Sequence, residues 1–149
     1  MSYDRGAIEQ VCVQHQIPSR RCSESELELD FANEGVLVLV NINQGADTFL
    51  GFRDCPWHTQ GALRLVTGDA THVEYAPEAL VQALVAGEVL VVSQYVGGRV
   101  RNRWLTHRAE PLDLRYVEAG EELRVCPIAG PADVPNHRLS TPLPTSPEV

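Results

Sequence analysis

The sequence VLVVSQYVGGRVRNRWLT, residues 89–106, contains two apolar runs separated by Gly97 and Gly98. A glycine pair between two such runs is a strong signal for a tight hairpin, because glycine reaches positive φ without a steric penalty. We therefore predict two antiparallel strands, at Val89–Val96 and Val100–Thr106. This hairpin is the clearest local structure that the chain encodes.

On both sides of this hairpin, most of the chain is also predicted to form extended strands. Apolar runs of strand length occur on both sides of it, whereas helical spacing of apolar residues occurs only at Ala7–His15 and from Pro77 to Gly87. Parallel strands need a crossover helix between each pair, and only one internal helix is convincing. We therefore predict an α+β fold, a mostly antiparallel sheet with two helices packed on one face. The other main predicted strands are Val36–Ile42, Thr48–Phe52, Leu112–Val117 and Glu122–Ile128.

The length of 149 residues, 44% of them hydrophobic, suits one compact domain with a sizeable core. We predict a single α+β domain over residues 1–129. From Gly130 onward, five prolines fall among mostly polar residues. This composition predicts a Pro-rich tail over residues 130–149 that is extended or disordered and dispensable for folding.

The net charge of the chain indicates the class of partner. Acidic residues outnumber basic ones by 20 to 12, for a formal charge of −8, so nucleic acid and anionic membranes are repelled on average and a basic protein is attracted. Neither a secretory signal nor an apolar run of transmembrane length is evident. These features predict a cytoplasmic protein that binds neither nucleic acid nor membrane.

A stripe of acidic residues precedes the first long apolar run. Its carboxylates alternate with apolar residues such as Leu27 and Leu29, the period of a half-buried strand with one acidic face. One interpretation is a surface that docks a charged protein. The alternative is a solvated face, or pairing with the basic stripe Arg99, Arg101 and Arg103. The acidic stripe consists of Glu24, Glu26, Glu28 and Asp30.

The turn at residues 53–61, RDCPWHTQG, places a thiol, an imidazole and an indole between extended segments. We predict that Asp54, Trp57 and His58 contact the partner, with Trp57 as an aromatic anchor of the kind enriched among interface hot spots. The alternative for Trp57 is an indole folded over the edge of the core. A small-molecule binding module with its pocket near Trp57 is a further possibility.

Catalytic and metal sites are the competing interpretations of the same turn. Cys55 with His58 or His107 offers a nucleophile and a base, as in a small cysteine-dependent hydrolase or transferase. A structural cysteine is the simpler interpretation. The Cys-x-x-His spacing at Cys12 and Cys55 offers two thiolates and two imidazoles, but nothing in the sequence fixes a metal geometry. We therefore predict no catalytic residue, metal or cofactor.

Three features together resemble a family of binding proteins. The turn Pro56-Trp57-His58-Thr59, the late hairpin and Arg103-Trp104-Leu105, in a small acidic α+β chain, resemble the immunity proteins of bacterial polymorphic-toxin systems of the type VI or contact-dependent kind. The resemblance spans about Gly35 to Cys126 and transfers no site residues. It implies an antitoxin that binds and occludes one cognate protein toxin.

Overall fold

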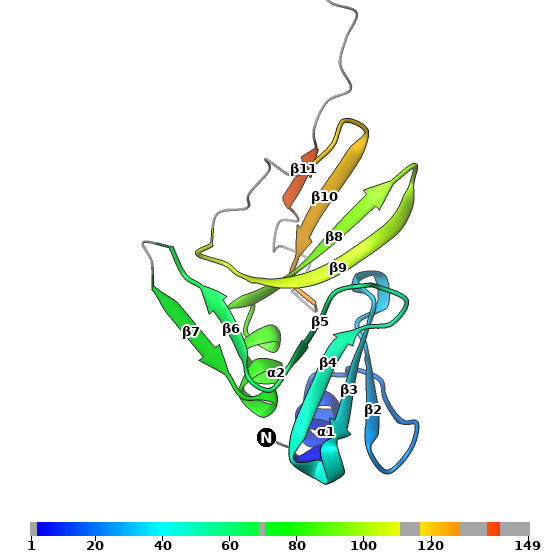
Figure 1. The fold of residues 1–149 in the computed structure, drawn as a ribbon, viewed down its shortest axis with the longest axis vertical. Coiled ribbons are helices and arrows are strands. Elements are labelled where there is room, and N and C mark those ends of the chain that lie inside the picture. Colours follow the sequence, from blue (N-terminus) through cyan, green and yellow to red (C-terminus); the bar gives the residue numbers. More distant parts are fainter. Residues whose placement is uncertain (1–2, 69–70, 111–116, 129–136, 141–149) are drawn as a thin grey trace, which may run out of the picture.

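A computed structural model describes residues 3–68, 71–110, 117–128 and 137–140 (Figure 1). Within these residues, helices α1 (Arg5–Gln14) and α2 (Pro77–Val85) accompany antiparallel sheets of five, four and two strands. The fold is therefore α+β, as predicted. Neither described helix has the length and hydropathy needed to cross a membrane.

The five-stranded sheet forms the N-terminal half of the fold. Its strands follow one another in sequence order, each antiparallel to the next. Short 3-10 turns at Ala32–Glu34 and Asn43–Gly45 join the central strands. The strands are β1 (Ser19–Arg21), β2 (Glu26–Asp30), β3 (Val36–Ile42), β4 (Asp47–Phe52) and β5 (His58–Gln60).

The four-stranded sheet contains the predicted hairpin, which is confirmed as β8 (Val89–Val96) and β9 (Arg99–His107). The order of its strands is β11, β10, β8, β9, with β10 at Glu121–Cys126 and β11 at His137–Ser140. A separate two-stranded ribbon, β6 (Leu63–Val66) and β7 (His72–Tyr75), precedes α2.

Part of the predicted tail is a strand of this sheet. The backbone of β11 pairs with β10 in antiparallel register, so the proposed boundary at residue 129 leaves out an edge strand. The remainder of the predicted tail, residues 130–136 and 141–149, lies outside the described residues. So does most of the predicted strand Leu112–Val117, of which only Val117 is described, outside any strand.

Both helices begin where the sequence supplies a start signal. The Asp4 side chain caps α1 by accepting a hydrogen bond from the Ala7 amide at 3.1 Å, and Pro77 occupies the first turn of α2. Ile8 and Cys12 of α1 pack in the same core as Leu80 of α2. Figure 1 shows α1 behind β3 and β4.

The two-residue period of β2 and β3 determines which of their side chains are buried in the core. Leu27, Leu29, Leu37 and Leu39 all point to the side where the helices pack, and each is 0% exposed. Because side chains alternate along a strand, the residues between these leucines must point to the opposite side. The leucine face of the five-stranded sheet thus closes the core, and its other face is left open.

Arg103 of β9 links the four-stranded sheet to the five-stranded one. Its guanidinium donates to Ser93 Oγ of β8 at 3.1 Å and to the Asn33 carbonyl oxygen, before β3, at 3.2 Å. Gly35 leaves the space for this side chain: it has φ of +98°, and a Cβ there would lie 2.9 Å from Arg103 Cδ. A larger residue at position 35 would therefore be strained and would displace Arg103.

We expect Leu39→Ala to lower the free energy of unfolding by about 2–5 kcal/mol, because it opens a cavity in a fully buried site. Val38→Ala is the matched control, one residue away on the open face, where the loss is about 1 kcal/mol or less. Urea titration followed by circular dichroism measures both. Equal losses would contradict the assignment of the two faces.

Candidate functional site

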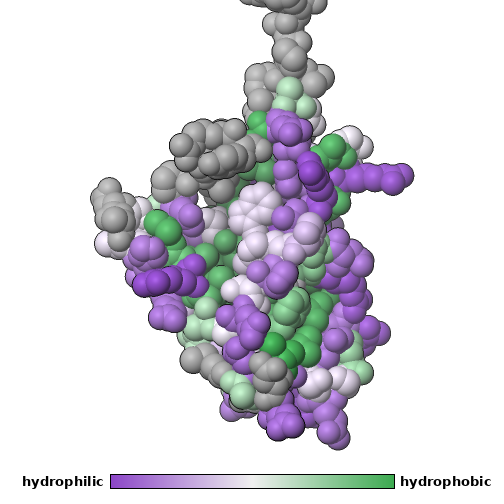
Figure 2. Space-filling model, in the orientation of Figure 1, coloured by the Kyte–Doolittle hydropathy of each residue, from purple (hydrophilic) through white to green (hydrophobic). Residues whose placement is uncertain are grey.

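The outer face of the five-stranded sheet, opposite its leucine face, is the candidate functional site. Hydrogen-bonded registers place its residues in rows that run across the strands. At its centre a strip of half-buried apolar side chains from β3 and β4 is bordered by polar residues from the neighbouring strands, and Figure 2 shows this apolar patch. The outer face consists of Arg20, Glu26, Glu28, Asp30, Val36, Val38, Val40, Phe49, Gly51, His58 and Gln60.

Two features that are distant in the sequence meet on this face. The row Glu28, Val38, Gly51, His58 connects the predicted acidic strand to the predicted functional turn. Gly51 allows the close approach of β5, since a Cβ there would lie 3.1 Å from the Trp57 carbonyl oxygen and 3.2 Å from His58 Cβ. The His58 ring stacks on Phe49 with 5.2 Å between centroids.

The other predicted contact residues lie beside the outer face or behind it. Glu24 precedes β2 and is exposed, as is Asp54, which has φ of +61° in the turn after β4. Trp57 points to the core side: its half-buried indole packs against Phe52, with 6.2 Å between centroids. Its backbone amide donates to Asn102 Oδ1 at 3.0 Å. Trp57 therefore matches the alternative of an indole folded over the core edge.

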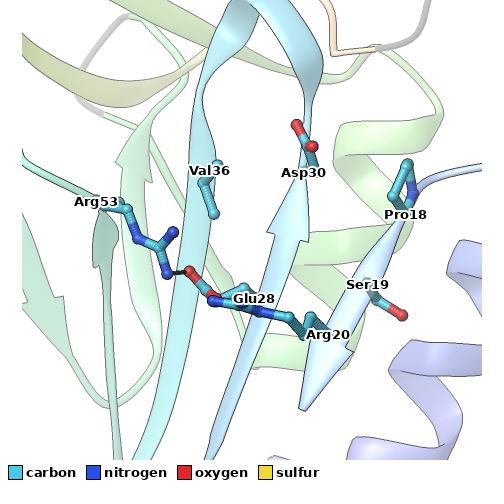
Figure 3. Close-up of a pocket in the computed structure, with 7 residues that line it drawn as sticks. All are labelled: Pro18, Ser19, Arg20, Glu28, Asp30, Val36 and Arg53. Carbon is cyan, nitrogen blue, oxygen red and sulfur yellow. Dashed lines mark hydrogen bonds and ion pairs between the residues drawn. The ribbon is translucent and has the colours of Figure 1, made fainter. Parts of the chain in front are cut away.

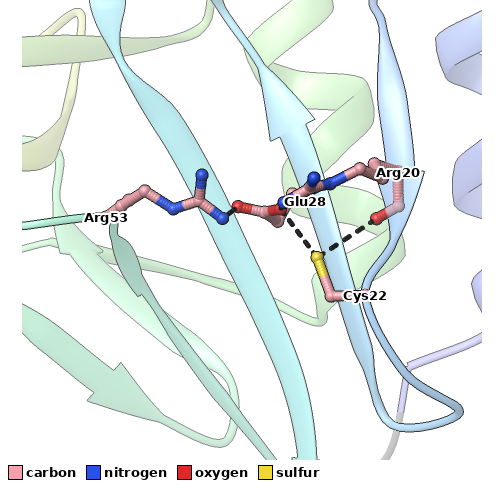
Figure 4. Close-up of polar contacts among 4 residues, drawn as sticks. All are labelled: Arg20, Cys22, Glu28 and Arg53. Atoms are coloured by element: carbon pink, nitrogen blue, oxygen red, sulfur yellow. Dashed lines mark hydrogen bonds and ion pairs between the residues drawn. The ribbon is translucent and has the colours of Figure 1, made fainter.

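The acidic stripe is not uniformly solvated, because the Glu28 side chain is only 5% exposed. Glu28 Oε1 accepts hydrogen bonds from Arg20 Nε at 3.0 Å and Arg20 Nη2 at 2.5 Å, while Oε2 contacts Arg53 Nη2 (Figure 4). Glu28 is therefore neither a solvated carboxylate nor a partner of the basic stripe on β9, which were the alternatives for the acidic stripe. Both arginines come from other segments, Arg20 from β1 and Arg53 from the turn after β4. We call this arrangement the Arg20–Glu28–Arg53 clamp.

The two stripes of opposite charge do not pair with each other. The basic stripe lies on β9, in a different sheet from β2. Arg101 pairs instead with Glu121 of β10 at 2.9 Å, and Arg103 makes the link between sheets described above. Glu28, Arg101 and Arg103 thus have partners within their own sheets or at the junction.

A pocket of about 320 Å³ lies beside the clamp, at one end of the outer face. Figure 3 shows it over β1, β2 and β3, with both helices on the far side of the sheet. Trp57 does not line this pocket, so it is not the pocket expected near that residue. The lining residues are Pro18, Ser19, Arg20, Glu28, Asp30, Val36 and Arg53.

A group of possible metal ligands also occurs at the clamp. Ligand atoms of Cys22, Glu26 and Glu28 lie within 4.8 Å of one another. However, two guanidinium groups hold the Glu28 carboxylate, and the Cys22 thiol donates to Glu28 Oε1 at 2.7 Å. These positive charges disfavour a cation there, so we assign no metal to this group. In the described part of the chain, the two Cys-x-x-His pairs form no such group.

The contacts of Cys55 do not assemble a cysteine–histidine pair. Burial raises the pKa of its thiol, and the neighbouring Arg103 guanidinium lowers it in part. His58 Nδ1 faces the Pro56 carbonyl oxygen at 3.1 Å. His107 is buried on β9, where its Nδ1 accepts a hydrogen bond from the Ala109 amide. Both imidazoles are thus held by contacts of their own, which favours a structural role for Cys55.

Comparisons with known proteins place the chain in no family. No family model, curated protein or solved structure matches it significantly. Functional assignment therefore depends on the geometry of the outer face and the chemistry of its residues.

Thiol reactivity tests the burial of the cysteines. Burial raises the pKa of Cys12 and of Cys126 to about 11, so the reactive thiolate is scarce at both near pH 8. We expect iodoacetamide to modify the exposed Cys22 first, with Cys12 and Cys126 protected until the protein unfolds. Peptide mass spectrometry after timed labelling, with Cys22→Ser as control, measures this order. Early labelling of Cys126 would contradict it.

Removal of the shared acceptor tests the clamp. We expect Glu28→Ala to lower the free energy of unfolding by about 1–3 kcal/mol, because it leaves Arg20 and Arg53 without their partner while both retain access to solvent. Glu26→Ala, two residues away on the same face, is the matched control and should cost about 0.5 kcal/mol or less. Chemical denaturation measures both. Similar values for the two variants would show that the clamp contributes nothing.

Proposed function

We propose that the protein is an immunity protein: it binds one cognate toxin of a bacterial polymorphic-toxin system in the cytoplasm, occludes it and catalyses no reaction. The observation that carries the proposal is the outer face of the five-stranded sheet. That face combines a continuous apolar strip with an acidic edge on a rigid scaffold. Contiguous apolar surface with a polar rim is typical of protein interfaces.

The apolar strip gives the proposed interface its centre. Val36, Val38 and Val40 project from β3, and Phe49 from β4 lies beside Val40 in the register. All four are half-buried in the free protein, so a partner can remove further apolar area from water. The packed leucines on the opposite side hold these residues in place, which limits the entropy lost on association.

The acidic edge favours a basic partner. Asp30 is exposed and Glu26 is half-exposed beside the strip, and the whole chain carries a formal charge of −8. Arg20 and Arg53 are each paired with Glu28, which offsets part of their charge on this face. A basic toxin surface, such as that of an enzyme that binds nucleic acid, is therefore steered towards it.

Two substitutions on the outer face test the proposal. We expect Val38→Asp to weaken toxin binding at least about tenfold, because it places a charge in the apolar centre. Glu26→Arg should slow association and reduce its dependence on salt. Val13→Asp is the control, because Val13 is 78% exposed on α1, away from this face. Surface plasmon resonance against the toxin domain encoded next to the gene measures all three, after circular dichroism confirms folding.

Growth protection completes the test. The wild-type chain and Val13→Asp should rescue cells that express the toxin domain, and Val38→Asp should not. Equal rescue by all variants would move the interface off the outer face. The absence of any toxin-like neighbouring gene, or failure of the wild-type chain to protect, would overturn the proposed function.

A further inference from the structure

The pocket beside the clamp carries charges of both signs, a pattern that docking of a basic protein alone does not explain. Its walls hold two guanidinium groups, Arg20 and Arg53, and two carboxylates, Glu28 and Asp30, so their formal charges sum to zero. Pro18 and Val36 add apolar surface. A volume of about 320 Å³ lies at the lower end of the range for small-molecule sites.

Glu28 orients the two guanidinium groups towards each other across the sheet. It engages Nε and Nη2 of Arg20 and Nη2 of Arg53, and the other guanidinium nitrogens of these arginines have no partner among the described residues. Figure 3 shows a terminal nitrogen of Arg53 directed away from Glu28, towards Val36. Arginine donors fixed in this way suit a ligand carboxylate.

Asp30 supplies the opposite charge at a separate position. Its Oδ1 accepts a hydrogen bond from the Ala32 amide at 2.8 Å, which holds the carboxylate in place. Figure 3 shows this carboxylate apart from the line formed by Arg53, Glu28 and Arg20. The second oxygen is therefore available to an ammonium group that lies beside the arginines.

We infer that the pocket binds a free α-amino acid with an apolar side chain. The ligand carboxylate meets Arg53 and Arg20, its ammonium meets Asp30, and its side chain lies along Pro18 and Val36. A zwitterion matches a pocket whose charges cancel, whereas a simple anion faces two carboxylates and a simple cation faces two guanidinium groups. This site belongs to the isolated protein and does not depend on a toxin partner.

Three probes with the same branched side chain test this inference: L-leucine, 4-methylpentanoate, which lacks the amine, and 3-methylbutylamine, which lacks the carboxylate. We expect the full chain to bind L-leucine at least about tenfold more tightly than either of the others at low ionic strength. Isothermal titration calorimetry and ligand-observed NMR measure the three affinities. Inorganic phosphate is included as a plain anion.

Two variants test which pocket residue binds the ligand's ammonium group and which binds its carboxylate. Asp30→Asn should weaken L-leucine binding and slightly strengthen 4-methylpentanoate binding, so that the preference for the zwitterion is lost, and Arg53→Gln should weaken binding of both. Arg99→Gln, an exposed arginine on β9, is the control and should bind as the wild-type chain does. Because Asp30 lies outside the clamp, Asp30→Asn keeps the test valid if Arg53→Gln is unstable.

Certain outcomes would overturn the inference. They are no binding of L-leucine, equal affinity for L-leucine and phosphate, or L-leucine affinity unaltered by both variants. Each of these leaves the growth-protection result unaffected, so failure of the amino-acid site and failure of the proposed immunity function are distinguishable.

Discussion

The alternation of side chains along β2 and β3 is the constraint on which both the core and the candidate site depend. Leucines at every second position pack under the helices, so the positions between them are forced onto the outer face. A slip of one residue in the register would bury Glu28 and Val38 under the helices and expose four leucines. The same pattern that specifies the fold therefore also determines which groups a partner meets.

Ion pairs and hydrogen bonds of arginine side chains support the parts of the fold that have little buried surface, first of all β1. All three residues of β1 are exposed, and two arginines fix the strand from opposite sides of the sheet. Arg20 reaches Glu28 on the outer face, whereas Arg21 reaches Glu9 of α1 on the helix side. Arg103 plays a comparable role at the junction of the two sheets. Arg20 and Arg21 thus add ion pairs and hydrogen bonds to the backbone pairing that holds β1 on β2.

Local patterns predicted most of the elements, and long-range pairing accounts for what they missed. The glycine pair, the alternation in β2 and the proline at the start of α2 act over a few residues, so the hairpin, the strand and the helix were predictable. The clamp was not, because Arg20, Glu28 and Arg53 come together only through the registers of four strands. The short strands β1 and β5 also lack a local signal. Trp57 was ambiguous for a similar reason, since its side of the sheet depends on how β5 pairs with β4.

The clamp also has a physical cost that apolar residues at the same positions would avoid. Burying a carboxylate requires compensation by its partners, and well-packed hydrophobic residues are often as stable or more so. Apolar residues there would, however, extend the strip of Val36, Val38 and Val40 across most of the outer face. Such a broad exposed apolar sheet face favours association between copies of the chain. The clamp limits the width of the strip with groups that two identical faces would have to desolvate together. A partner that supplies complementary charge avoids that penalty, so the clamp favours a specific partner over self-association.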